Sequence, residues 1–245
     1  MRLTILIAVL FVFQLTSAQM TGTIFYEEKA DLHRNLPPEK EEVKNMIPQF
    51  NVSKWVLTFN GDESIYQTLK EKELTGTGAN QSFNMRDGGR ENRVLYKNLA
   101  EDKIVDSRDF MQKQFLIKGF TSSRKWKIGK KQKQILNYNC LEASLQIDSA
   151  TLLTAWFTPQ IAVSNGPSDF QGLPGLILQT DINDGERTIT ATEIKLNDPE
   201  LAPIVIPTKG KEITSEEFEK LRKEKMKEMN MQQSGTGPMM ITRRY

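Results

Sequence analysis

Histidine and cysteine are almost absent from this chain, which holds one of each among its 245 residues, His33 and Cys140. A single cysteine excludes an intramolecular disulfide, and a single histidine excludes a histidine-rich zinc site within one chain. A Ser-His-Asp or Cys-His catalytic arrangement would have to use His33, which lies in a proline- and charge-rich stretch typical of a solvated loop. We interpret Cys140 as a small buried hydrophobic residue, with a reactive or intermolecular thiol as the alternative.

An excess of charge of one sign is also absent, because the formal net charge is only +2. This balance gives no reason to expect nucleic acid or an acidic surface as a partner. Hydrophobic residues make up 38% of the chain, which is enough for a core if the long polar stretches are loops and tail. Beyond the N-terminus, no segment is apolar enough to predict a transmembrane helix.

The one long apolar run, residues 3–15, follows the positive Arg2 and precedes the small residues 16–18. This order is typical of a secretory signal peptide with cleavage between Ala18 and Gln19. The run is shorter than the roughly 20 residues of a bilayer-spanning helix, which disfavours the alternative of a membrane anchor. No cysteine stands directly after the run, so the lipid attachment of a bacterial lipoprotein is excluded. We therefore expect residues 1–18 to be removed and a soluble mature chain to be periplasmic or secreted.

Short segments with alternating apolar residues dominate the mature chain. This alternation predicts strands at residues 20–27, 53–60, 64–68, 93–99, 103–107, 109–118, 122–129, 134–148, 151–158, 176–181 and 187–196. Asn60-Gly61 and Asn183-Asp184-Gly185 are turn signals that predict two hairpins. Within 134–148 the apolar parity changes at Cys140-Leu141, which indicates a bulge or a strand that passes between two packing environments.

Little of the remaining sequence predicts helix. Residues 39–46 fit a short helix, and Thr214 with Glu217 has the spacing of a capping box that begins a charged helix to about residue 230. Residues 70–92 are polar and glycine-rich, which predicts a long mobile loop. Many strands with short links favour a mainly-β fold with a curled antiparallel meander sheet, a barrel or half-barrel that limits exposed edges, and a C-terminal helix. We expect a single β-rich domain over 19–207 and a charged helix with a methionine-rich tail over 208–245.

An ordered series of short motifs resembles a known family. It consists of Phe115-Leu116-Ile117-Lys118, Trp126-Lys127-Ile128, Tyr138-Asn139-Cys140 with Ala143, Ala155-Trp156-Phe157-Thr158-Pro159, Gly166-Pro167, Phe170, and Gly172-Leu173-Pro174-Gly175-Leu176-Ile177-Leu178. The series resembles the GLPGLI family, exported proteins of unknown function from Gram-negative bacteria of the Bacteroidetes type. A proline usual in the loop after Thr-Pro is replaced by Ala162. The resemblance implies an envelope location and a β-rich domain, and it implies no activity.

The hexapeptide itself permits two interpretations. Pro174 fixes φ near −65° and Gly175 accepts positive φ, which is the pairing at the centre of a type II turn feeding a buried strand. The alternative is the rim of a ligand pocket, where glycines beside aromatic residues allow a ligand to approach closely. The possible rim residues are Trp156, Phe157, Pro159, Phe170, Gly172, Leu173, Pro174, Gly175, Leu176 and Ile177.

No group of residues has a spacing that catalysis demands. Ser164 and Asp169 lie near one another in sequence, and Asp181, Asp184 and Glu186 gather at a predicted hairpin tip, where polar residues are the rule. The tail is more distinctive, because thioethers are soft ligands that suit Cu(I). Its methionines are Met226, Met229, Met231, Met239 and Met240. We treat them either as apolar packing residues or as a soft-metal site.

These observations favour an exported protein that is not an enzyme. We expect it to bind a small or apolar ligand in the concavity of the sheet, or another protein of the envelope. The alternative function is copper handling through the methionine-rich tail.

Overall fold

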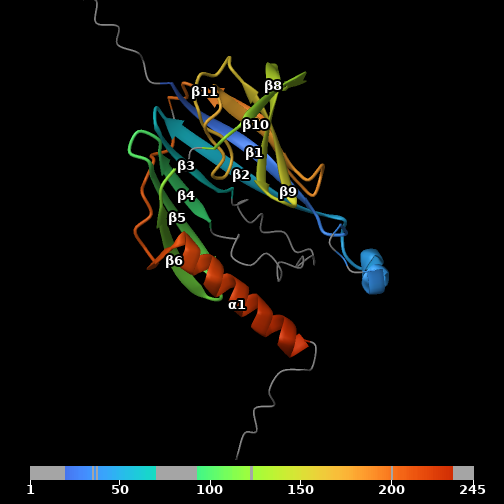
Figure 1. The fold of residues 1–245 in the computed structure, drawn as a ribbon. Coiled ribbons are helices and arrows are strands. Elements are labelled where there is room, and N and C mark those ends of the chain that lie inside the picture. Colours follow the sequence, from blue (N-terminus) through green and yellow to red (C-terminus); the bar gives the residue numbers. More distant parts are fainter. Residues whose placement is uncertain are drawn as a thin grey trace, which may run out of the picture.

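The computed structural model describes residues 20–34, 36, 38–69, 93–121, 124–199 and 201–233. They form one twelve-stranded sheet, a 3-10 helix and a C-terminal α-helix (Figure 1), which confirms the mainly-β class. The strands are β1 (Thr21–Asp31), β2 (Phe50–Asn60), β3 (Glu63–Thr68), β4 (Val94–Asn98), β5 (Lys103–Phe110), β6 (Lys113–Gly119), β7 (Lys127–Ile135), β8 (Tyr138–Asp148), β9 (Thr151–Thr158), β10 (Leu176–Ile182), β11 (Arg187–Leu196) and β12 (Lys211–Thr214). The helices are η1 (Pro38–Asn45) and α1 (Ser215–Gln233).

The sheet consists of two meanders joined through the β1–β11 pair. Its strand order is β12-β6-β5-β4-β3-β2-β1-β11-β10-β9-β8-β7, and every pair is antiparallel except the parallel pair β12–β6. The prediction of a barrel or half-barrel was wrong, because the described part of the chain has no pairing between the terminal strands β12 and β7. The β7 edge carries several lysines, which discourage pairing with another strand, and β12 is only four residues long.

Both predicted hairpins are confirmed. Asn60-Gly61 joins β2 to β3, with Gly61 at φ 58°. The turn between β10 and β11 places Asn183, Asp184 and Gly185 at φ 50°, 55° and 98°. Asparagine, aspartate and glycine tolerate these left-handed conformations better than other residues do, which explains why the turns could be predicted from the sequence.

Two turns without glycine were missed. The predicted strand 109–118 is divided into β5 and β6 by Met111 and Gln112, which have φ 49° and 63°. The predicted strand 134–148 is divided by a turn at Leu136, with φ 52°, which makes β7 and β8 a hairpin. Such residues rarely adopt positive φ, so nothing in the local sequence marks these turns.

The parity change at Cys140-Leu141 reflects a strand covered on both faces. Cys140 is buried in a cluster with residues of β1 to β4, whereas Leu141 packs against a second cluster around Phe157. Pairing of β8 with β7 is continuous across Cys140 and Leu141, and the register shift in that pair comes at the next step, opposite Leu141 and Ala143, where β7 holds the extra residues. The irregularity therefore lies beside the parity change and not at it. The other alternative, a strand lying between two packing environments, is confirmed.

Helix α1 packs at one end of the sheet, beside β6 (Figure 1). Its predicted capping box is confirmed, because the Thr214 N–H donates to Glu217 Oε2 at 2.9 Å and the Glu217 N–H donates to Thr214 Oγ1 at 3.2 Å. Phe218 fixes the helix by edge-to-face contacts with Phe110 and Phe115. Among the described residues, no helix is both long enough and apolar enough to span a membrane.

Three predictions concern residues outside the described part of the chain. These are the signal peptide at 1–18, the loop at 70–92 and the end of the tail beyond residue 233. They stay predictions.

Candidate functional site

The Gly-Leu-Pro-Gly-Leu-Ile sequence ends a connection between β9 and β10, residues 159–175, which we call the crossing loop. The crossing loop contributes Ile161 and Val163 to the cluster that also contains β1 and β2, and Phe170 and Leu173 to the cluster over β8, β9 and β10. It is therefore packed on both sides of β10. This position lets it bring residues from distant strands together.

Gly175 is required by a close approach of two backbone segments. A Cβ added there would lie 2.2 Å from the Thr158 carbonyl oxygen, and its φ is 150°. The Gly175 N–H donates to the Leu173 carbonyl at 2.8 Å, so the hydrogen-bonded turn is centred on Pro174 and is tighter than the predicted type II turn. The turn interpretation holds in its main point, which is a tight turn that leads into the buried residue Leu176.

The possible rim residues do not form one pocket. Phe157, Leu173, Gly175, Leu176 and Ile177 are buried in the core, and the side of the hexapeptide that reaches solvent is formed by Pro174 and Gly172. Pro159 is exposed in the turn after β9, and the half-buried Trp156 lies under Lys133, whose Nζ is 4.1 Å from its ring centroid. Gly172 lines one cavity of the described part of the chain and Phe170 lines another.

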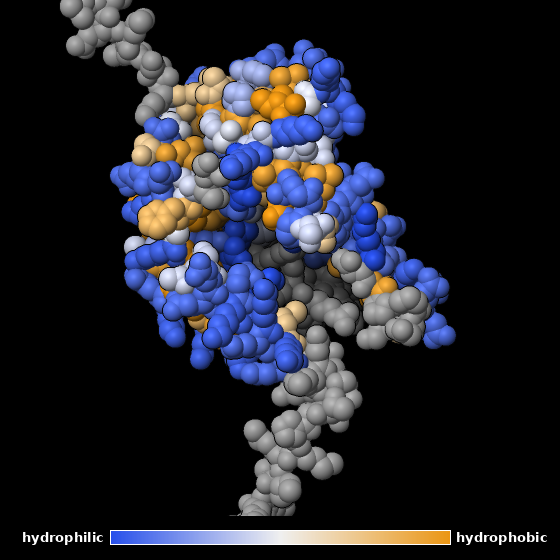
Figure 2. Space-filling view, viewed as in Figure 1, coloured by the Kyte–Doolittle hydropathy of each residue, from blue (hydrophilic) through white to orange (hydrophobic). Residues whose placement is uncertain are grey.

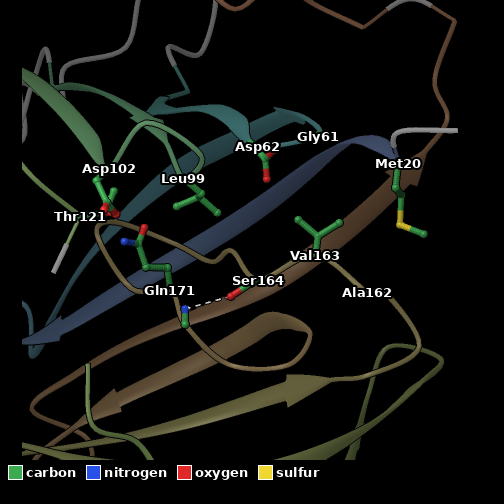
Figure 3. Close-up of a pocket in the computed structure, with 11 residues that line it drawn as sticks. Met20, Gly61, Asp62, Leu99, Asp102, Thr121, Ala162, Val163, Ser164 and Gln171 are labelled. Carbon is green, nitrogen blue, oxygen red and sulfur yellow. Dashed lines mark hydrogen bonds between the residues drawn. The ribbon is translucent and has the colours of Figure 1, made fainter. Parts of the chain in front are cut away.

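The larger cavity, which we call the end cleft, has a volume of about 550 Å³ and lies where several connections meet at one end of the sheet (Figure 3). The turns β2–β3 and β4–β5, the crossing loop and the residues flanking β1 and β6 all contribute to it. Its lining residues are Met20, Gly61, Asp62, Leu99, Asp102, Thr121, Ala162, Val163, Ser164, Gln171 and Gly172. A volume of this size is typical of small-molecule sites.

Hydrogen-bond acceptors dominate the polar groups of the end cleft. Gln171 is 6% exposed, and its Oε1 atom is buried with no hydrogen-bond donor among the described residues. The Thr121 hydroxyl donates to Asp102 Oδ1 at 2.5 Å, and Ser164 Oγ accepts the Gly172 N–H at 3.2 Å (Figure 3). With the two carboxylates, Asp62 and Asp102, the cleft presents acceptors to whatever enters it.

Three cationic side chains anchor the crossing loop from outside it. The Lys97 ammonium, fully buried, donates to the carbonyls of Gly166 at 3.0 Å and Ser168 at 2.9 Å. Arg93 Nη1 donates to Ser168 Oγ at 3.1 Å, and Arg124 forms an ion pair with Asp169. A loop with little regular structure is thereby held in one position by Lys97 of β4, by Arg93 just before β4 and by Arg124 just before β7.

Burial and ion pairing shift the protonation equilibria of this group in different directions. Burial lowers the pKa of Lys97 to about 7, although Asp169 opposes that shift. Burial alone would raise the pKa of Asp169, but Arg124 and Arg93 outweigh it and hold that pKa below its usual value. Burial disfavours the charged form of Arg93, yet Asp106 outweighs burial and raises the Arg93 pKa.

The polar residues considered for catalysis have structural contacts. Ser164 accepts a backbone N–H as described above, and Asp169 pairs with Arg124. At the hairpin tip, Asp181 accepts the Gly185 N–H at 2.7 Å and Glu186 accepts the Asn183 amide at 2.7 Å.

His33 lies apart from these residues, and its Nε2 atom is 3.1 Å from the Ile47 carbonyl oxygen. The lone cysteine is equally unsuited to nucleophilic chemistry in this state, because burial raises the pKa of Cys140 to about 11.

The proposed soft-metal residues fall mostly outside the described side chains. Met226 is 47% exposed on α1. The side chains of Met229 and Met231, and all of Met239 and Met240, lie outside the described part of the chain. Among the described residues, no group of three or more His, Cys, Asp or Glu side chains could hold a metal ion. The copper hypothesis stays a prediction.

Sequence reasoning missed the polar residues that shape this region. Lys97 and Asp106 lie in strands β4 and β5 and are 0% and 4% exposed. A usable signal existed, because Arg93 and Lys97 share the strand parity of the buried Leu95. A charged residue at an inward position of a strand indicates either a buried ion pair or a site.

The comparisons with known proteins agree with the fold. Residues 144–179 match the Porph_ging family, described as a protein of unknown function, and this stretch contains the hexapeptide. The chain is similar to the solved structure of PNGF-II in space group P21, with 17% sequence identity and a TM-score of 0.54. The C2 crystal form of PNGF-II gives 17% and 0.53.

These two alignments cover 83% and 82% of this chain and 33% and 32% of the PNGF-II chain, so the chain spans about a third of that protein. At this identity the likeness concerns the fold alone. No curated protein matches the chain.

Proposed function

We propose that this chain is an exported envelope protein of the GLPGLI family that binds a small polar ligand in the end cleft without converting it. Family membership is supported by the Porph_ging match over 144–179, which includes Gly172 to Ile177. Export is supported by the signal-peptide pattern of residues 1–18. The ligand site differs from the pocket expected from the sequence, because most of the aromatic and aliphatic motif residues are used in the core.

The buried Gln171 amide oxygen carries the ligand proposal. An acceptor buried without a donor costs roughly 1–3 kcal/mol, and native proteins keep few such groups without a reason. Gln171 lines a cavity of about 550 Å³, and a rotation of its side chain would bring the shielded Oε1 atom to a ligand inside that cavity. Binding a donor would remove the cost.

The ligand class follows from the polarity of the walls. Asp62, Asp102 and Gln171 all offer acceptors, and the Ser164 hydroxyl can donate while it accepts the Gly172 N–H. Apolar contact comes from Met20, Leu99 and Val163. A compact molecule with several hydroxyl or amino groups and a small apolar face fits this arrangement better than a purely apolar ligand does.

The lining also favours binding over catalysis. The end cleft contains one potential nucleophile with a hydroxyl not engaged as a donor, Ser164, and no histidine, lysine or cysteine lines it among the described residues. A serine without an adjacent base is a weak nucleophile.

The test is native mass spectrometry of the mature protein purified from its own cell envelope, compared with the variant Gln171→Met. The substitution removes the unpaired acceptor at similar volume, so the fold should keep its stability or gain some, while the copurified molecule should be lost. Gln132→Met, on the exposed β7 edge, is the matched control and should retain the molecule. Equal retention by both variants, or a wild-type protein that carries no ligand, would argue against the end cleft as the binding site.

A further inference from the structure

A second cavity, lined in part by other residues of the crossing loop, lies between helix α1 and the sheet. It has a volume of about 300 Å³ and is lined by four arginines, Arg93, Arg108, Arg187 and Arg222, together with Phe170 and Phe218. We call it the arginine cleft. Figure 2 shows strongly hydrophilic side chains in the middle of this face of the molecule, above the position of α1 in Figure 1.

The floor of the arginine cleft consists of two guanidinium groups on one carboxylate. Arg93 Nη2 lies 2.8 Å from Asp106 Oδ2 and its Nε lies 3.1 Å from both carboxylate oxygens. Arg108 places Nη2 at 2.6 Å and Nε at 2.8 Å from the same Oδ2 atom. The Asp106 side chain is 5% exposed and that of Arg93 is 15% exposed, so this triad is largely shielded from water.

Positive charge exceeds negative charge around the cleft. Arg187 pairs with Glu28 at 3.2 Å and Arg222 pairs with Glu219 at 2.9 Å, while Arg93 and Arg108 both pair with Asp106. The four arginines therefore share three carboxylates in all. Asp169 also lines the cleft, but it is neutralised by Arg124. Within the described part of the chain, the cleft therefore keeps one formal positive charge in excess.

An uncompensated cation beside a partly buried cavity attracts an anion more strongly than an exposed cation does, because little water screens it. Guanidinium groups present several N–H donors in one plane, which suits the paired oxygens of carboxylate and phosphate. Ser168 adds a hydroxyl that accepts Arg93 Nη1, and the Phe218 ring holds Arg108 with its Cζ atom 5.6 Å from the ring centroid. The guanidinium groups are thus preorganised.

We propose that the arginine cleft is a second ligand site, which takes a small oxyanion or the phosphate or carboxylate group of a larger ligand. The site is separate from the end cleft and would take the opposite chemistry, since its donors are cationic and the end cleft presents acceptors. It does not depend on the function proposed above.

The test is a titration of the mature full chain with inorganic phosphate, followed by amide NMR shifts, with succinate as the carboxylate arm. We expect saturable shifts for residues of β4, β5 and the start of α1. Tighter binding of phosphate would identify a phosphate-bearing ligand, and tighter binding of succinate would identify a carboxylate-bearing one.

Two substitutions make the test specific. Arg222→Gln removes a cleft arginine from the exposed side of α1 and should weaken binding about tenfold or more, as expected for one charge-assisted hydrogen bond. Lys223→Gln removes the same charge from a neighbouring exposed position that does not line the cleft, and should change the affinity less than about twofold. Arg108→Gln should remove the excess charge and abolish binding. Absence of saturable shifts with either anion, or equal weakening by Arg222→Gln and Lys223→Gln, would overturn the proposal.

Discussion

Replacement of Lys97 by methionine is predicted to change how the stability of the protein depends on pH. Lys97 is 0% exposed, and its ammonium donates to two carbonyls of the crossing loop. Burial lowers its pKa to about 7, from an ordinary value of 10.5. Methionine has a similar length and shape without the charge, so Lys97→Met removes the titration and leaves the packing nearly unchanged.

The direction in which stability changes with pH follows from proton binding. Between pH 7 and pH 10.5 the unfolded chain keeps the Lys97 proton while the folded protein has lost it, so this group stabilises the folded state more as pH rises. The stabilisation is complete above the unfolded pKa and is lost as pH falls toward the folded pKa. Each pH unit corresponds to about 1.4 kcal/mol, which gives about 5 kcal/mol over the full range and about 2 kcal/mol between about pH 7 and pH 9.

The assay is urea unfolding of the wild type and of Lys97→Met at several pH values between about 7 and 9. The difference in unfolding free energy should move in favour of the wild type by about 2 kcal/mol as pH rises, because the titration of all other groups cancels in the difference. Lys113→Met, at an exposed position of β6, should show no such trend. A difference for Lys97→Met that is equally flat would refute the argument that the ammonium is buried at a cost.

Three further predictions concern the fold around the two clefts. Gly175→Ala places a Cβ 2.2 Å from the carbonyl oxygen of Thr158, the last residue of β9, and should destabilise by about 3–5 kcal/mol in urea unfolding. Gly172→Ala has space and should cost only about 1–2 kcal/mol of backbone strain, so equal costs would contradict the steric reasoning. Asp106→Asn leaves two guanidinium groups without their shared carboxylate and should lower the free energy of unfolding by about 3–5 kcal/mol. Glu212→Gln, in an exposed pair, should change it by no more than about 1 kcal/mol. A small effect at Asp106 would show that the triad is well solvated. Phe218→Ala removes the main attachment of α1 and about 3–5 kcal/mol of packing free energy. Hydrogen exchange should therefore accelerate in α1 and remain slow in β1 and β2. An unchanged exchange rate in α1 would show that other contacts hold the helix.

The local features of this protein, its hairpin turns and its helix cap, could be predicted from the sequence. The hairpin turns at Asn60-Gly61 and Asn183-Asp184-Gly185, and the capping box of Thr214 and Glu217, depend on residues close together in the chain. The turns at Met111-Gln112 and Leu136 depend on the strands that they join, since those residues adopt positive φ only because the hairpins on either side require it. Such turns carry no compositional signal.

The candidate sites needed the tertiary structure. The sequence placed a glycine- and proline-rich connection beside aromatic residues, which allowed either a tight turn or the rim of a pocket. In the folded protein most of those side chains are buried in two hydrophobic clusters. Gln171, Lys97 and Asp106 were not identified, because what makes each one notable is its burial and its partner across the fold. A polar residue becomes a candidate site residue when the fold shields it from water, and the spacing of residues in the sequence does not indicate which residues are shielded.

The sequence by itself determined a mainly-β chain, its local turns and the cap of its only long helix among the described residues, since these depend on neighbours within a few positions. Only the tertiary structure decided that the sheet stays open, because closure depends on whether β12 and β7, far apart in the chain, meet edge to edge. It also decided that the crossing loop contributes residues to both an acceptor-lined cleft and an arginine-lined one. Those properties arise from long-range contacts, whose free energies no local pattern encodes.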